Sequence, residues 1–232
     1  GVRIMAYTNI DDPSAHFHTQ LYTGTGPNQD IVNDAHSGNF KPDFLWIKNR
    51  TNGNNESWKV YHQAIGNTHS LTLDTTAAKN DNVEWWSDET PTSTVFTVGR
   101  QDATNNNSMI AYCFAEKQGY SKFGIYTGNG NVDGPFVYTG FKPAWLLRKR
   151  TDSTGSTWLI HDSKRGVNTN AVRLRADLNN AEDSGNEVDL LSNGFKIRET
   201  GGYGNASGSP YIYMAFAEQP FVTSTGVPAT AR

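Results

Sequence analysis

The amino-acid sequence predicts an all-β chain of two similar antiparallel β-sandwich domains, jelly-roll-like and arranged in tandem. Many short apolar segments are separated by turns rich in Gly, Asn and Asp, which is typical of sandwiches. No window longer than about ten residues carries the apolar stripe of a capped helix. Strands joined by such short turns pair antiparallel by default. The chain also repeats itself at an interval of about a hundred residues, and this repeat predicts two domains rather than one.

The repeat is clearest in a Phe-Lys-Pro segment that occupies residues 40–51 and again residues 141–151. Proline has no N–H to donate to a strand ladder, so each Lys-Pro pair is expected to begin a strand. The residues that follow are apolar without alternation, which indicates a strand buried on both faces. We therefore expect this segment to be the central strand of each half, with Trp46 and Trp145 buried in the core.

Further pairs of segments keep the same order in both halves. They are Tyr22-Thr23-Gly24 with Tyr126-Thr127-Gly128, Trp58 with Trp158, residues 96–98 with 195–197, and residues 110–116 with 212–218. The interval is too long for solenoids or propellers, whose repeats run about 20–50 residues. Each copy is instead the size of a small domain.

The repeat also suggests the domain boundaries. We expect a lead-in strand or linker at residues 1–16, sandwiches at 17–118 and 119–220, and a tail at 221–232. A domain of about a hundred residues buries only a modest core, so the two copies are expected to pack on each other. The linker at 119–124 is short and carries two aromatic residues, which favours docked domains. Because the sequence begins with Gly1 and not Met, it is expected to be a fragment or a processed product of a longer polypeptide.

Composition argues against two classes of partner. The net charge of −3 and the pI near 6.1 provide no electrostatic footprint for nucleic acid or for an anionic membrane surface. No apolar run approaches the ~18 residues of a membrane span. The single cysteine, Cys113, cannot form an internal disulfide and is expected to behave as a small buried hydrophobe. We therefore expect no nucleic-acid binding and no membrane insertion.

Motifs for metals and cofactors are incomplete. There is no nucleophile elbow, no phosphate-binding loop and no cysteine cluster. His16 and His18 could share a metal ion, but no third ligand is evident nearby. Residues 129–134 match the first half of a calcium loop, but Gly140 stands where the bidentate Glu is needed. A Gly/Asn turn explains this loop better, and no cofactor or metal is expected.

Two glutamates raise the alternative of a glycosidase. Glu116 and Glu218 end equivalent segments, and glycosidases use two carboxyl groups about 5–10 Å apart in one cleft. Here each glutamate is the counterpart of the other and belongs to its own half. We therefore expect structural roles at the strand ends and no enzymatic activity.

Aromatic residues provide the remaining functional signal. Neighbouring residues in a strand face opposite ways, so one of Trp85 and Trp86 is expected to point outward. An exposed aromatic ring among hydrogen-bonding groups is suited to stacking on a sugar. If the loops that flank these segments meet at one end of the sandwich, Glu84, Tyr61 and His62 lie beside Trp85 and Trp86, and these five are the predicted ligand-binding residues. An inter-domain contact is the alternative for this pair.

Several longer motifs resemble a known family. They are Gly-Tyr-Ser-Lys-Phe-Gly (119–124), Tyr-Thr-Gly-Asn-Gly (126–130), Asp-Gly-Pro-Phe-Val-Tyr-Thr-Gly (133–140), Leu-Ser-Asn-Gly-Phe-Lys (191–196) and Tyr-Ile-Tyr-Met-Ala-Phe-Ala-Glu (211–218), together with the Phe-Lys-Pro segments. This set resembles an uncharacterised domain family, often in tandem copies, in tail-fibre and other virion proteins of marine tailed bacteriophages. The resemblance covers about residues 21–221 and transfers no catalytic residue.

The resemblance implies a virion protein, the C-terminal, host-facing part of a tail fibre. The expected function is non-enzymatic binding of a cell-surface receptor, either a glycan or a protein. The alternatives are a structural module of a fibre or capsid that binds other virion subunits, and a polysaccharide depolymerase. A homotrimer is an open alternative for the assembly. A large exposed apolar patch would favour the structural module, and a cleft with two perturbed carboxylates would favour the enzyme.

Overall fold

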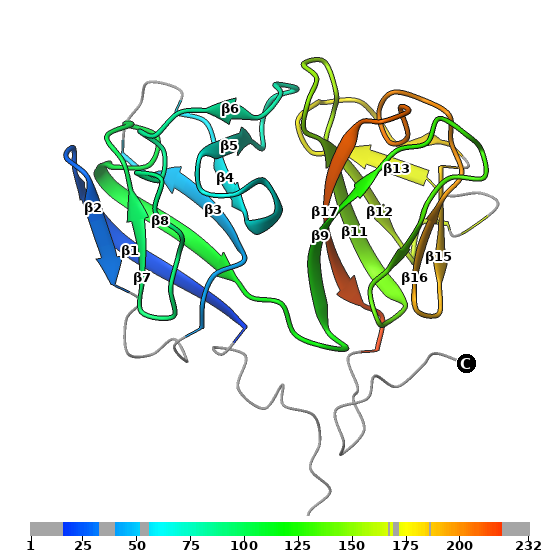
Figure 1. Ribbon diagram of the computed structural model, residues 1–232, viewed down its shortest axis with the longest axis horizontal. Helices are drawn as coiled ribbons and strands as arrows, with labels where there is room; N and C mark the ends of the chain where they lie inside the picture. The colour runs from blue at the N-terminus through cyan, green and yellow to red at the C-terminus, as the bar shows by residue number, and fades with distance from the viewer. Residues whose placement is uncertain are drawn as a thin grey trace, which may run out of the picture.

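The chain folds into two β-sandwiches that lie side by side (Figure 1). The computed structural model describes residues 16–32, 40–51, 56–166, 168, 172–185 and 187–219. The expected lead-in at residues 1–16, except for His16, and the expected tail at 221–232 lie outside this part of the chain. No α-helix occurs in the described ranges, and none of their segments is a helix with the length and apolarity to cross a bilayer.

The first sandwich packs a large sheet against a small one. Its strands are β1 (Phe17–Thr25), β2 (Gln29–Val32), β3 (Phe44–Asn49), β4 (Lys59–His62), β5 (His69–Thr72), β6 (Asn80–Asp81), β7 (Val95–Val98) and β8 (Asn106–Phe114), with a 3-10 turn η2 (Gln63–Ile65) after β4. The large antiparallel sheet has the order β1-β8-β3-β4-β5-β6, and β2 pairs with β7 in the small sheet.

The second sandwich repeats this arrangement. Its strands are β9 (Ser121–Thr127), β10 (Phe136–Tyr138), β11 (Pro143–Arg150), β12 (Leu159–Asp162), β13 (Val172–Arg175), β14 (Asp183–Ser184), β15 (Val188–Leu191), β16 (Gly194–Ile197) and β17 (Pro210–Ala217). Read from β9, the large sheet has the order β9-β17-β11-β12-β13-β14, which matches the first sheet strand for strand. The small sheet, β10-β16-β15, has one strand more. The all-β prediction of two tandem, duplicated sandwiches is confirmed.

Both faces of the central strands are covered, as the unbroken apolar runs predicted. Leu45 and Ile47 of β3 point into the core of the first sandwich. The alternate residue Phe44 points the other way, into an apolar cluster built from both domains. In β11, Leu146 faces its own core and Leu147 faces the shared cluster. The domains are therefore docked through the outer faces of their large sheets.

Trp46 and Trp145 depart from the prediction because they are only half-buried. Both pack at the margin of the shared cluster and not inside a sandwich. The register explains why they are not equivalent to each other. Phe44 pairs with Phe114, and Trp145 pairs with Phe216 at the corresponding place, so Trp145 corresponds to Phe44. Its indole therefore faces the other domain.

Hydrogen bonds cross the domain interface in both directions. His62 and Gln63 reach from the first domain to the carbonyl oxygens of Tyr213 (3.1 Å) and Phe123 (3.0 Å). In return, the indole of Trp158 donates to the carbonyl oxygen of Thr72 at 2.8 Å. Backbone polar groups at the edge of an apolar cluster need such partners. The contacts fix the position of one sandwich on the other.

The repeated Tyr-Thr-Gly segments close both sandwiches in the same way. The hydroxyl of Tyr22 donates to the carbonyl oxygen of Thr104, and that of Tyr126 donates to the carbonyl oxygen of Gly204. Each segment then passes so close to the returning chain that a Cβ on its glycine would meet backbone atoms. Only glycine allows this approach, which accounts for the motif in both copies.

Candidate functional site

The predicted outward-facing tryptophan does not occur, and that part of the site prediction is wrong. Trp85 and Trp86 are both buried. Residues 83–88 form a turn and not a strand, so neighbouring side chains need not alternate between two faces. Trp86 packs edge-on against Tyr61, and its indole N–H donates to the carbonyl oxygen of His69 at 2.9 Å. It belongs to the core of the first domain.

The other predicted ligand residues are also engaged inside the protein. Tyr61 is in the core of the first domain, and His62 is fully buried at the domain interface. Burial lowers the pKa of His62 to about 4. Glu84 is partly exposed but accepts a hydrogen bond from Gln101 at 2.5 Å and lies 3.8 Å from Arg100. The five residues do not form one exposed surface.

A polar pocket of about 450 Å³ lies beside Trp85. The ammonium of Lys59 sits over the indole, 4.1 Å from the ring centre, and the indole N–H donates to Asn80 at 2.9 Å. Burial lowers the pKa of Lys59. The face of Trp85 is therefore occupied by a cation–π contact. A sugar could stack there only after displacing Lys59.

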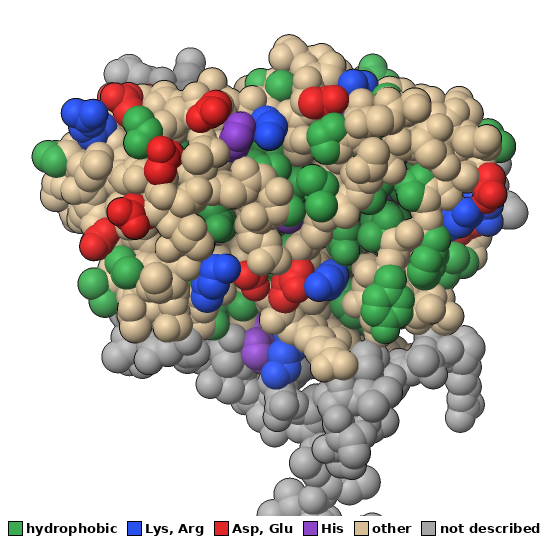
Figure 2. All heavy atoms as spheres, in the orientation of Figure 1, with side chains coloured by type: hydrophobic (Ala, Val, Ile, Leu, Met, Phe, Trp, Pro, Cys, Tyr) green, Lys and Arg blue, Asp and Glu red, His purple; other side chains and the backbone are tan. Residues whose placement is uncertain are grey.

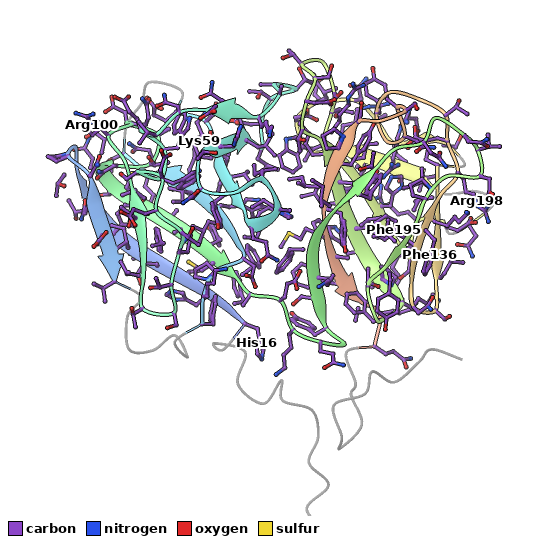
Figure 3. All side chains as sticks on the ribbon, in the orientation of Figure 1. His16, Lys59, Arg100, Phe136, Phe195 and Arg198 are labelled. Carbon is purple, nitrogen blue, oxygen red and sulfur yellow. The ribbon has the colours of Figure 1, made fainter. Side chains whose placement is uncertain are left out.

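Exposed aromatic side chains occur instead in the second domain, on β10. Phe136 and Tyr138 are 44% and 63% exposed, whereas Val137 between them is buried in the core. This alternation places the two rings on the outer face of the small sheet. Gly194 on β16 allows β10 to approach closely, since a Cβ there would lie 2.1 Å from the carbonyl oxygen of Val137 and 3.0 Å from the ring of Phe136. Figure 3 shows Phe136 over the small sheet, and Figure 2 shows green side chains gathered there.

A pocket of about 340 Å³ adjoins Tyr138. Its lining comes from β10 with its following turn, from the connection between the domains and from the start of β9, and comprises Glu116, Gln118, Ser121, Lys122, Tyr138, Thr139 and Gly140. The Lys122 ammonium lies 2.8 Å from the carboxylate of Glu116. The other carboxylate oxygen of Glu116 accepts the backbone N–H of Phe123 at 2.8 Å, which fixes the pair in place. We call Phe136, Tyr138 and this pocket the Tyr138 site.

The Tyr138 site joins two kinds of contact. Its exposed rings offer an apolar surface for stacking. The Glu116–Lys122 pair places a hydrogen-bond acceptor beside a donor, and Gln118, which is exposed, supplies both. Such a combination suits the apolar face and the hydroxyl groups of a sugar ring.

The most strongly charged cluster is buried within the second domain. The guanidinium of Arg148 is wholly buried and contacts Glu199 at 2.9 Å and Glu187 at 3.1 Å. It also donates to Nε2 of His161 at 3.1 Å. Because a guanidinium can only donate, His161 is neutral, and burial together with Arg148 holds its pKa well below the usual range. Because Arg148 pairs with both Glu187 and Glu199 inside the domain, we assign the cluster to stabilising the fold.

An aromatic groove of about 360 Å³ opens at the margin of the domain interface. It is lined by His16, Phe17, Trp46, Tyr112, Phe114, Tyr120 and Phe216, and His16 lies at the base of the junction in Figure 3. Nearly every lining side chain is aromatic. The groove therefore favours an apolar group over a sugar, which needs hydrogen bonds as well.

Other candidates from the sequence have structural contacts. Oδ1 of Asn129 accepts the N–H of Asn131, and Oδ1 of Asn131 accepts the N–H of Asp133, so these oxygens already have partners in a turn. Glu218 pairs with Lys142 at 2.7 Å at the end of β17. Within the ranges that the structure describes, no group of three or more His, Cys, Asp or Glu could hold a metal ion. Cys113 is fully buried in the core.

Sequence reasoning missed the Tyr138 site although a signal was present. Residues 136–138 alternate aromatic, aliphatic and aromatic, which is the period of a strand with one exposed face. The segment is only three residues long and follows Pro135, so its pattern does not distinguish a strand from a loop. The contribution of the inter-domain connection depends on how the domains dock, which no local pattern reveals.

Comparison with known proteins places the chain in a family. No curated protein and no solved structure matches it. The family described as "Domain of unknown function (DUF7483)" matches residues 12–57 and 51–220, and the second match spans both sandwiches. Because these matches cover most of the sequence, the chain belongs to that family of domains of unknown function.

Proposed function

We propose that this protein is a non-enzymatic binding module that recognises a cell-surface glycan through the Tyr138 site. The observation that carries the proposal is the pair of exposed rings, Phe136 and Tyr138, beside a pocket with fixed polar groups. The resemblance to tail-fibre domains favours a location on a virion and a receptor on a host cell. Other virion subunits are then further partners.

The chemistry of the site favours a neutral sugar. Lys122 and Glu116 already neutralise each other at 2.8 Å, so a charged ligand group would have to break their pair. Two adjacent hydroxyl groups could instead donate to the carboxylate and accept from the ammonium. Stacking on one ring contributes around a kcal/mol, so each site should bind weakly. Several copies on one particle would supply the avidity.

A glycan array with the purified chain tests the proposal. Phe136→Ala with Tyr138→Ala should weaken binding of the best neutral glycan at least roughly tenfold, because both stacking surfaces are lost. The matched control is Leu178→Ala with Tyr203→Ala, which removes two side chains that are each 44% exposed elsewhere on the same domain. Equal loss in both double variants, or no loss in either, would contradict the proposal.

The aromatic groove favours a second candidate function, a structural module of the virion. Subunit interfaces expose apolar surface before assembly, and this groove is continuous with the apolar interface between the domains. The partner would be another virion subunit that inserts an apolar side chain. Tyr120→Glu should then prevent incorporation into particles while glycan binding by the isolated chain is retained. Normal incorporation of this variant would contradict the second candidate.

A further inference from the structure

Strand register gathers most rings of the aromatic groove on one face of the first large sheet. Phe17 of β1 pairs with Phe114 of β8, and Tyr112 of β8 pairs with Trp46 of β3. Residues that pair across neighbouring strands share a face of the sheet, as do residues two apart in one strand. These four rings therefore lie on the outer face, which is the face turned towards the second domain.

The rings are tilted against one another and not stacked in parallel. The ring centres of Trp46 and Phe114 are 5.3 Å apart at an interplanar angle of 75°, and those of Phe17 and Phe114 are 4.9 Å apart at 39°. Across the domain interface, Phe216 lies 6.3 Å from Phe114, and Tyr120 lies 5.5 Å from Phe216, both at 57°. Rings set at such angles enclose a concave space, here of about 360 Å³.

The composition of the lining favours a cation over a neutral apolar group. No aliphatic side chain, lysine or arginine is among the lining residues that the structure describes. Aliphatic side chains would suffice for a neutral group, whereas the faces of aromatic rings carry partial negative charge and attract cations. The net charge of −3 adds a weak attraction of the same sign. The groove is therefore complementary to positive charge.

An ordinary ammonium group fits the groove less well than a methylated one. Where Lys59 lies over Trp85, its ammonium also donates a hydrogen bond to the hydroxyl of Thr72 at 2.9 Å. An ammonium that is enclosed without acceptors has a large desolvation cost, and the groove's side chains offer few acceptors, namely two tyrosine hydroxyls and one imidazole. A trimethylammonium group has no N–H to satisfy, so aromatic rings alone can enclose it.

From this geometry we propose that the aromatic groove binds the trimethylammonium group of a small soluble compound such as choline. The methyl groups would contact rings of both domains, so the site is complete only in the docked pair. Phe17 is 39% exposed and the other rings of the groove are half-buried, which favours a solute over a head group held in a bilayer. The inference goes beyond the proposed glycan site, because it concerns another surface and a cationic ligand.

Calorimetry at about 0.15 M salt tests the proposal with three ligands, because unspecific attraction is screened there. They are choline, ethanolamine with its primary ammonium, and the neutral analogue of choline with a tert-butyl group. Choline should bind at least roughly tenfold more tightly than either of the others. Phe17→Leu with Tyr120→Leu should weaken choline binding roughly tenfold, because two ring faces are lost while apolar surface remains. Phe17→Tyr with Tyr120→Phe keeps both rings and should bind choline as the unmodified chain does.

The matched control is Phe136→Leu with Tyr138→Leu, which makes the same two exchanges at exposed rings outside the groove. It should bind choline as the unmodified chain does, so failure of the groove and failure of the Tyr138 site can be distinguished. Phosphatidylcholine vesicles should not sediment the chain. Equal affinity of choline and the neutral analogue, equal affinity of choline and ethanolamine, no binding of choline at millimolar concentration, binding to the vesicles, or an equal loss in the control would each overturn the proposal.

Discussion

The two domains share one backbone arrangement but fill the middle of it with different chemistry. Counted from the equivalent pairs Phe44–Phe114 and Trp145–Phe216, Ile47 of β3 corresponds to Arg148 of β11. Both side chains are almost completely buried. In the first domain Ile47 lies among apolar and aromatic residues, whereas in the second Arg148 is held by Glu187 and Glu199.

The comparison shows which residues a duplicated fold must keep. Asn105 and Asn205 are both fully buried and hold the same loop in their domains. The side-chain oxygen of each accepts the backbone N–H of the residue after the Tyr-Thr-Gly segment at 2.9 Å. This residue is Thr25 in the first copy and Asn129 in the second. Groups that satisfy buried backbone atoms are retained, because no apolar residue can replace them. Groups that only fill space are free to change, provided that the new residues fill the same space and that every buried charge among them has a partner.

The largest expected effect is in the apolar core of the first domain. Trp86→Ala should cost about 3–5 kcal/mol of the free energy of unfolding, because it leaves a cavity and an unpaired carbonyl oxygen on His69. Urea unfolding followed by circular dichroism measures the loss. Binding at the Tyr138 site by the fraction that remains folded should persist. Lost binding with an unchanged melting temperature would restore the tryptophan pair as a ligand surface.

The charged cluster around Arg148 in the second domain should lose stability for a different reason. Arg148→Met should also cost about 3–5 kcal/mol, because it leaves Glu199 buried without its arginine and leaves Glu187 with Arg173 alone. Adding Glu187→Gln and Glu199→Gln should recover most of this loss, whereas no second substitution could repair a cavity so simply. Arg198→Met is the control at a 41% exposed arginine and should change stability little. Failure of the triple variant to recover would show that charge is not what holds this core.

The buried asparagines test the shared part of the comparison. Asn105→Ala and Asn205→Ala should each destabilise by up to about 3 kcal/mol, because several buried backbone groups lose their partner. Asn105 donates to the carbonyl oxygen of Gly99 at 2.7 Å, and Asn205 donates to that of Asn131 at 2.8 Å. Paired thermal and urea melts measure both losses. A large loss in one variant and none in the other would mean that the two loops are not held alike.

The smallest expected effect is a dependence on pH that involves both domains. An unfolded histidine titrates near pH 6.5, while burial lowers the pKa of His62 to about 4 and that of His161 well below its usual range. Below pH 6.5 the unfolded chain therefore binds more protons than the folded one, so stability falls as pH falls. His62 alone should account for roughly 2 kcal/mol between pH 7 and pH 5. Urea titrations at these pH values should show a smaller decrease for His62→Phe than for the unmodified chain.

The sequence by itself determined the fold class, the duplication and the docking of the two halves. Unbroken apolar runs in the Phe-Lys-Pro segments predicted strands covered on both faces, and β3 and β11 have one face in their own sandwich and one against the other domain. These signals are local, because strand period, turn residues and proline act on neighbouring residues. The strands β2 and β10 are not predicted, because β2 lies in a polar stretch and the three residues of β10 lie between Pro135 and Gly140.

Tertiary structure decided where functional groups are exposed. Burial depends on residues distant in sequence, so one of Trp85 and Trp86 is expected on the surface, whereas a turn places both inside. Tyr138 is only part of a motif in the sequence, whereas the structure brings Glu116 of the inter-domain connection and Lys122 of β9 beside it. Arg148 is charged and yet buried, because Glu187 and Glu199 neutralise it from positions 39 and 51 residues further along the chain. A sequence lists which groups are available, but only packing decides which of them meet a partner and which are left for a ligand.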